Sequence, residues 1–185
     1  MTRTCLPVAA MPVPLPTDVR LRPADASDAP VLAALHARAI GALDTTYYTA
    51  AELAAWSARM TPERFRALLP TRHITVAEMV TSSGPRIVGY AQLLPDEGVI
   101  EAVYVDPDFG RRGIGAALVR AVEDDGRALG LPGLVLDATL NSIAFYAAQG
   151  YRQECLSHHE LAPGVSIACA VMEKRLESRG APAAC

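Results

Sequence analysis

The spacing of hydrophobic and polar residues predicts a strand followed by three helices in the first part of the chain. Apolar and charged residues alternate from Val19 to Arg22, which is the period of a strand. Apolar residues then recur at helical spacing from 31 to 43, behind a proline that suits the first turn of a helix. Thr49 and Glu52 have the spacing of a capping box, and Thr61-Pro62-Glu63 is typical of a further helix start.

From His73 onward the hydrophobic period becomes that of strands. Three strands are predicted, at 73–79, 87–94 and 99–105. The connecting segments are short and contain glycine and proline, so we expect the three strands to form an antiparallel meander.

The rest of the chain alternates helices and strands. In order, the pattern predicts a helix at 113–129 ended by Gly130, a strand at 134–138, a helix at 142–149 capped by Asn141, and a hairpin of strands 151–161 and 167–174 around Pro163-Gly164. A crossover helix joins the strands at 99–105 and 134–138, so these two are expected to be parallel. The fold class predicted is one α+β domain with a mixed sheet.

Composition narrows the class of protein. The 185 residues are 51% hydrophobic and 20% charged, which is typical of a globular domain that needs no metal or disulfide to fold. A net charge of −3 argues against nucleic acid as a partner, because binding phosphates needs a surplus of Lys and Arg. The four cysteines are scattered and show no metal-ligand spacing, which predicts no metal site and fits a cytoplasmic protein.

The two ends of the chain are predicted to lie outside the domain. No apolar run approaches the ~20 residues that a membrane span requires, so no membrane association is expected. Prolines interrupt the apolar stretch of the first sixteen residues, which fits a secretory segment poorly. We expect a flexible or surface-docked extension at 1–17, a domain at 18–177 and a tail at 178–185.

The segment from Val103 to Ala116 carries the most specific chemistry. A predicted strand ends there, a turn with Gly110, Arg111 and Arg112 follows, and a helix opens on small residues. Free amides at a helix start, its dipole and two arginines suit a phosphate or pyrophosphate. Neither a Walker A loop nor a dinucleotide fingerprint matches the spacing. The alternative is a plain strand-to-helix turn with two solvated arginines.

A second segment, from Asp137 to Tyr151, gives the turn a context. Together the two segments resemble the GNAT superfamily of acetyl-CoA-dependent N-acetyltransferases, over about Val19 to Leu176. The matching residues are Arg111, Arg112, Gly113 and Gly115 in the turn, and Asn141, Phe145, Tyr146, Gly150 and Tyr151 in the later block. One departure is Gly110, which occupies the position of a Gln or Arg in the family pattern.

The resemblance implies a three-layer arrangement, a sheet of six to seven strands with helices on both faces and a splayed parallel strand pair. It implies acetyl-CoA as co-substrate, with the pantetheine arm beside the main chain of Val103 and Val105. The residues implied to hold the rest of the cofactor are Arg111, Arg112, Gly113, Ile114, Gly115, Ala116, Asn141 and Tyr146. The Val105 N–H would also hold the tetrahedral oxyanion.

Two residues are implied to be catalytic. Glu101, expected on the same strand face as Val103 and Val105, matches a family glutamate that acts as general base through water; the alternative is a surface glutamate beside a bulge. Tyr146 matches a tyrosine that protonates the departing thiolate; the alternative is a tyrosine that packs on the sheet.

The amine acceptor is expected beside the first two helices and the last hairpin. The candidate residues are His36, Asp44, Tyr47, Tyr48 and Trp56, although the three aromatic ones could simply cover the sheet edge. His158 and His159 are expected to point to opposite faces of a strand as ordinary surface or hairpin residues.

The function expected from the resemblance is acetyl transfer to a small primary amine by direct attack in a ternary complex, without a metal. No Ser-His-Asp or Cys-His arrangement points to a covalent enzyme intermediate. A catalytically silent acyl-CoA sensor and a protein or peptide N-acetyltransferase remain alternatives. A homodimer is compatible with the sequence.

Overall fold

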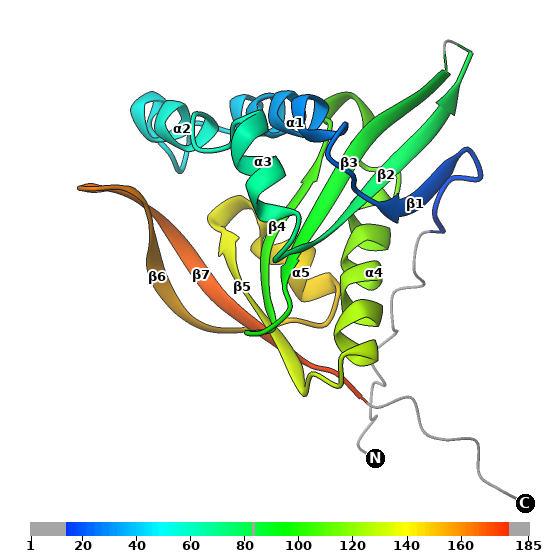
Figure 1. The fold of residues 1–185 in the computed structure, drawn as a ribbon. Helices are drawn as coiled ribbons and strands as arrows, with labels where there is room; N and C mark the ends of the chain where they lie inside the picture. Colours follow the sequence, from blue (N-terminus) through cyan, green and yellow to red (C-terminus); the bar gives the residue numbers. More distant parts are fainter. Residues whose placement is uncertain (1–13, 83, 178–185) are drawn as a thin grey trace, which may run out of the picture.

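Within residues 14–82 and 84–177, which the computed structural model describes, seven strands form one sheet in the order β1-β2-β3-β4-β5-β7-β6 (Figure 1). The strands are β1 Val19–Pro23, β2 His73–Thr81, β3 Gly84–Leu94, β4 Val99–Val105, β5 Gly133–Thr139, β6 Arg152–Ala162 and β7 Val165–Arg175. All neighbours are antiparallel except β4 and β5, which are parallel as expected from the crossover. The predicted tail at 178–185 and residues 1–13 of the predicted extension lie outside the described residues.

Helices cover both faces of the sheet (Figure 1). They are α1 Ala29–Gly41, α2 Ala50–Ser57, α3 Pro62–Leu68, α4 Ile114–Ala128 and α5 Ile143–Ala148, with short 3-10 turns at Pro107–Phe109 and Leu140–Ser142. In the described ranges, none of these helices combines the length and the apolar character needed to cross a membrane.

The apolar residues divide into cores on the two faces. On what we call the α1 face, Leu32, Phe65, Ile74, Val76 and Tyr90 are buried together. On the α4 face, the buried set includes Val88, Leu93, Ile114, Leu118 and Leu136. Since side chains alternate along a strand, one strand can supply both cores. The predicted α+β architecture with helices on both faces is confirmed.

Local signals explain where the helices begin. Thr49 and Glu52 form the predicted capping box, with the Glu52 carboxylate accepting from the Thr49 amide at 2.7 Å. Before α4, Gly113 has a φ of 78°, a left-handed conformation that glycine adopts at little cost. The prediction that Asn141 caps α5 is wrong. The chain first makes the 3-10 turn, which contains Asn141, and Ser142 stands at the N-cap position without a capping bond.

β4 and β5 part soon after they meet. Their pairing consists of Val99 with Val135 and Ile100 with Leu136. Beyond Ile100, β4 stays paired with β3, while β5 pairs with β7. The parallel pair therefore opens into a gap toward its carboxyl ends.

A bulge in β4 changes the direction of Glu101. Gln92 pairs with Ala102 and Leu93 with Ile100, so Glu101 has no pairing partner on β3 and is the extra residue of a β-bulge. Ile100, Val103 and Val105 pack on the α4 face, whereas Glu101 bonds to Gln92 on the α1 face. The expectation that Glu101 shares a face with Val103 and Val105 is therefore wrong, because the extra residue interrupts the alternation.

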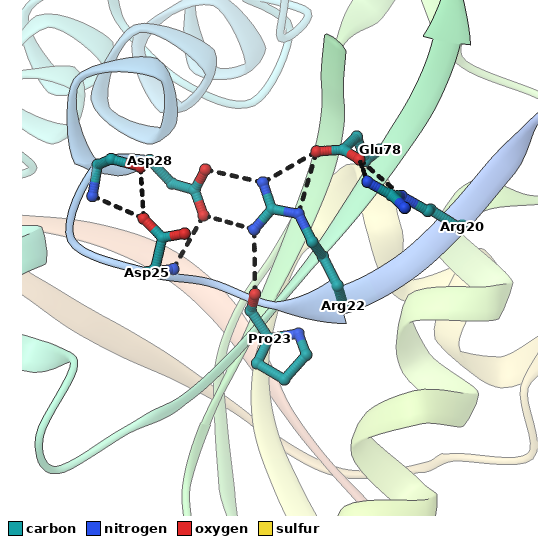
Figure 2. A network of polar contacts seen from close by, with 7 residues as sticks. Arg20, Arg22, Pro23, Asp25, Asp28 and Glu78 are labelled. Carbon is teal, nitrogen blue, oxygen red and sulfur yellow. Dashed lines mark hydrogen bonds and ion pairs between the residues drawn. The ribbon is translucent and has the colours of Figure 1, made fainter. Parts of the chain in front are cut away.

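Four charged side chains tie β1 and β2 to the start of α1 (Figure 2). The Arg22 guanidinium contacts both carboxylate oxygens of Asp28, at 2.7 and 2.9 Å, and donates from Nε to Glu78 at 3.0 Å. Arg20 donates to the other oxygen of Glu78 at 2.7 Å. Hydrogen bonds from Arg22 hold the pKa of Asp28 below its usual value, and those from Arg20 and then Arg22 do the same for Glu78.

Replacing Arg22 with methionine is expected to lower the free energy of unfolding by about 3 kcal/mol at pH 7, because it leaves the buried Asp28 carboxylate without its partner. Carboxylates with a lowered folded-state pKa stabilise the fold above their unfolded pKa, and this contribution is lost as the pH falls. The difference between variant and wild type should therefore shrink below about pH 4. Urea unfolding at several pH values measures both effects.

Arg152→Met provides the control, since Arg152 is 76% exposed and contacts only exposed carboxylates, at 3.3 and 3.5 Å. It should cost less than about 1 kcal/mol. Equal losses for the two variants would contradict a stabilising role for the Arg22 network.

Candidate active site

A cavity of about 500 Å³ opens where β4 and β5 part. Its lining draws on both faces of the sheet: Tyr90, Gln92 and Tyr104 from the α1 face, and Val105 and Tyr146 from the α4 side. Two molecules that enter from opposite faces could thus meet in the gap. A second hollow, near Gly150 and Lys174, contains none of the predicted site residues.

The structure brings some of the predicted site residues to this cavity and leaves others away from it. Those in the lining are His36, Trp56, Glu101, Val103, Val105, Asn141 and Tyr146. Tyr47 is 51% exposed and Tyr48 is buried, and both stand outside the lining. The Tyr48 hydroxyl donates to the Ala168 carbonyl at 3.0 Å and accepts from the Leu140 amide at 2.9 Å, so it fastens the second helix region to the sheet.

The glycine turn comes directly before α4. Its predicted cofactor residues, 111–116, are outside the cavity lining, although Gly115 lies next to the lining residues Val105 and Phe145. Among the described residues, no acceptor is hydrogen-bonded to the amides of 111–116; the preceding bond is Gly110 N–H to Pro107 O, and the next is Ala117 N–H to Gly113 O. Arg111 has a φ of 63°, which is uncommon for a residue with a side chain. The Arg112 guanidinium lies 5.3 Å from the centre of the Phe109 ring. Free amides and two arginines make this turn suitable for an anion.

At Gly115, the glycine turn packs against the segment from Asp137 to Tyr151. A Cβ built there would lie 3.3 Å from Phe145 Cζ and 3.7 Å from Val105 Cγ2. The first contact is tight, so the absence of a side chain lets α4 approach α5 and the end of β4. The two sequence segments that carry the family resemblance are therefore neighbours in space.

The main chain at the end of β4 faces the gap. Asp106 N–H donates to the Val88 carbonyl on β3 at 2.8 Å. Since backbone groups alternate in direction along a strand, Val103 and Val105 turn their N–H and C=O groups away from β3, toward the place where β5 has departed. These groups are positioned to pair with an extended ligand.

Tyr146 is buried within the cavity wall. Its ring packs edge-on against Phe145 and Tyr151, at centroid distances of 4.9 and 5.8 Å. Burial raises the pKa of the Tyr146 hydroxyl well above its usual range, so the group carries its proton at neutral pH. It is therefore available as a proton and hydrogen-bond donor at neutral pH.

Glu101 is held by two donors on the acceptor side of the cavity. Arg72 donates to its two oxygens at 2.5 and 3.2 Å, and Gln92 Nε2 donates to one of them at 2.6 Å. Gln92 is buried, and its own carbonyl oxygen finds no partner among the described residues. These contacts fix the direction of the carboxylate within the cavity.

Aromatic rings line the same side. His36 lies edge-on to Tyr104 at 4.8 Å, and its Nδ1 is 3.0 Å from the Tyr90 hydroxyl. Burial lowers the pKa of His36 to about 4, so the imidazole is neutral at physiological pH. The ring centroids of Trp56 and Tyr104 lie 6.4 Å apart, and Trp56 also belongs to the cavity lining.

Several residues of the cavity lining were not among those predicted from the sequence. They are Arg59, Arg64, Arg72, Gln92, Tyr104, Asp137, His159 and Cys169. His159, which was predicted as a surface or hairpin residue, lies on the β6–β7 hairpin with its side chain 43% exposed; it also lines the cavity and contacts Asp137 at 3.1 Å. These residues come from separate strands and helices, so no spacing along the chain marks them.

Comparison with known proteins identifies the family. The model of the acetyltransferase (GNAT) family matches residues 38–151. The crystal structure of a GCN5-related N-acetyltransferase from Rhodopseudomonas palustris is 30% identical, with a TM-score of 0.78 over 90% of this chain and 99% of that one.

Two more distant structures share the fold. They are an N-acetyltransferase from Thermoplasma acidophilum in complex with coenzyme A (15% identity, TM-score 0.70, 85% of this chain and 98% of that one) and a phosphinothricin acetyltransferase from Sinorhizobium meliloti in complex with acetyl-CoA (23%, 0.61, 86% and 89%). The match of the family model and the likeness to the R. palustris protein agree with the fold described above. The chain therefore belongs to the GNAT family of acetyltransferases.

Proposed function

We propose that the protein transfers the acetyl group of acetyl-CoA to a primary amine by direct attack in a ternary complex. The observation that carries this proposal is the parting of β4 and β5, which gives one cavity a lining from both faces of the sheet. A cofactor on the α4 side and an amine on the α1 side would then meet in the gap. The solved structures with bound coenzyme A or acetyl-CoA support the choice of cofactor.

The glycine turn would bind the pyrophosphate of the cofactor. The free amides of 111–116 and the charges of Arg111 and Arg112 favour an anion there. From this point the pantetheine arm would run along β4 and pair with the main chain of Val103 and Val105. Because Gly110 stands where the family pattern has Gln or Arg, one side-chain contact to the pyrophosphate would be missing, whereas the contacts from the main-chain amides would remain. Asn141, in the cavity lining, would contact the cofactor from the β5 side.

The chemical step would use groups at the gap. Glu101 would take a proton from the ammonium through water, because the protonated amine has no lone pair for attack. The amine nitrogen would then bond to the thioester carbon, and the Val105 N–H would stabilise the oxyanion. When the carbon–sulfur bond breaks, the thiolate would take the proton of Tyr146, which burial keeps protonated until then. The second proton, which the attacking nitrogen loses as the amide forms, would return to the tyrosine.

Direct attack is favoured over an acetylated enzyme. Cys169 is the cysteine in the cavity lining, and burial raises its pKa to about 11. At neutral pH it is a thiol rather than the nucleophilic thiolate. The aromatic, half-enclosed cavity is of a size that suits a small molecule.

Release of free CoA thiol from acetyl-CoA tests the proposal directly. With pooled amines, polyamines, amino acids, aminoglycosides and peptides, we expect thiol release that depends on at least one small-molecule pool. Binding of CoA without release by any pool would instead indicate a silent acyl-CoA sensor. Release with peptides alone would indicate a peptide acetyltransferase.

A further inference from the structure

Arg59 lines the cavity and has a guanidinium edge that forms no hydrogen bond to another described residue. The residue follows α2, is half-buried and belongs to the cavity lining. Its Nη1 makes both of its hydrogen bonds to other described residues, to His159 Nε2 at 3.0 Å and to the Glu160 carbonyl at 3.3 Å. The Nε and Nη2 groups form no hydrogen bond to another described residue. Together they form the planar edge of a guanidinium that pairs with a carboxylate.

His159 and Asp137 hold Arg59 from behind. Since a guanidinium only donates, His159 Nε2 must accept, which leaves the imidazole proton on Nδ1. Nδ1 then donates to Asp137 at 3.1 Å. This chain of contacts from β5 through β6 fixes the position of Arg59 and gives Nη1 an imidazole as its partner, not a carboxylate.

The charges around Arg59 also favour a bound anion at this position. Within the described chain, Arg59 and its neighbour Arg64 form no ion pair, whereas Arg72 on the same cavity is bound to Glu101. Burial and then the charge of Arg64 lower the pKa of Arg59, and the smaller opposing effects of Tyr104 and Glu101 do not reverse this direction. A half-buried cation beside a second cation is stabilised by an anion.

We propose that the acceptor is an amine that also carries a carboxylate, as an amino acid does, and that the Nε–Nη2 edge of Arg59 binds this carboxylate. The inference rests on the proposed acetyl transfer and specifies its substrate class. The two walls of the cavity suit such a molecule, with Arg59 and Arg64 on the helical side and Glu101 on the sheet side. The carboxylate is bound at the first wall, which leaves the amine free to face the second.

Matched pairs of acceptors test this assignment. The probes are L-amino acids, each compared with its carboxamide and with the amine that lacks the carboxyl group, in the CoA-release assay at saturating acetyl-CoA. Wild type should prefer the acids. In Arg59→Gln, the KM of the preferred acid should rise roughly 10- to 100-fold, while the KM values of its carboxamide and of acetyl-CoA stay the same. Arg59→Lys should recover only part of the loss, because an ammonium lacks the planar edge.

Arg66→Gln is the control, since Arg66 lies on α3 but outside the cavity and contacts Glu63. It should leave all three KM values unchanged. Release from carboxamides or plain amines in preference to acids overturns the substrate class while the acetyl transfer stands. An acid preference that survives Arg59→Gln overturns the role of Arg59. No release from any probe overturns the proposed function and, with it, the substrate class.

Discussion

Replacing Tyr146 with phenylalanine is expected to lower kcat by roughly 100- to 10,000-fold, the usual contribution of a positioned acid or base. The hydroxyl lies in the cavity lining and keeps its proton because it is buried. Without it, the thiolate would have to leave unprotonated. The aromatic contacts with Phe145 and Tyr151 would remain, so the affinity for CoA should change little. Steady-state kinetics and calorimetric titration with CoA separate the two quantities.

Tyr151→Phe is the matched control. Tyr151 is also buried and its ring contacts Tyr146, but it lies outside the cavity lining. The same loss of a hydroxyl there should leave kcat within a few-fold of wild type. If Tyr146→Phe retained full turnover, Tyr146 would have no part in the chemical step.

Replacing Gly113 with aspartate is expected to weaken CoA binding by at least about 100-fold, because like charges brought together in a binding site cost several kcal/mol. Gly113 immediately precedes α4, where the free amides of the turn would hold the pyrophosphate. A carboxylate at this point would occupy the anion position and repel the ligand. Its left-handed φ of 78° adds backbone strain. Calorimetric titration with CoA measures the loss.

Gly130→Asp separates charge from strain. Gly130 follows the other end of α4, has a φ of 73°, and has no neighbour within 4 Å of an added Cβ. The same substitution is thus made at a glycine with nearly the same φ, at the end of α4 that is far from the turn. We expect it to keep CoA affinity, and a loss as large as that of Gly113→Asp would point to disturbed folding of α4 instead of a pyrophosphate site at the turn.

Local patterns were sufficient for much of the fold. The capping box at Thr49 and Glu52, the glycine at 113 and the hairpin at Pro163-Gly164 depend on residues close in sequence, and the structure has each of them. The cap of α5 could not be predicted in this way. Ser142 hydrogen-bonds to the Thr139 carbonyl and tightens the chain into a 3-10 turn, which takes Asn141 away from the N-cap position.

The candidate site was only half visible in the sequence. The glycine turn and the Phe145-Tyr146 segment are continuous motifs, so they could be located. Glu101 was found, but its face was misassigned, because a bulge depends on the partner strand and leaves no mark on the strand that contains it. Arg59 and His159 are one hundred residues apart and meet only through the fold.

The extra residue in β4 lets a single strand serve two chemical tasks. Val103 and Val105 turn main-chain groups to the gap, whereas Glu101 and Gln92 supply side chains on the opposite face. If acetyl-CoA binds as proposed, substrate preference could diverge among relatives, or be redesigned in the laboratory, without rebuilding the part of the strand that would bind the acyl donor.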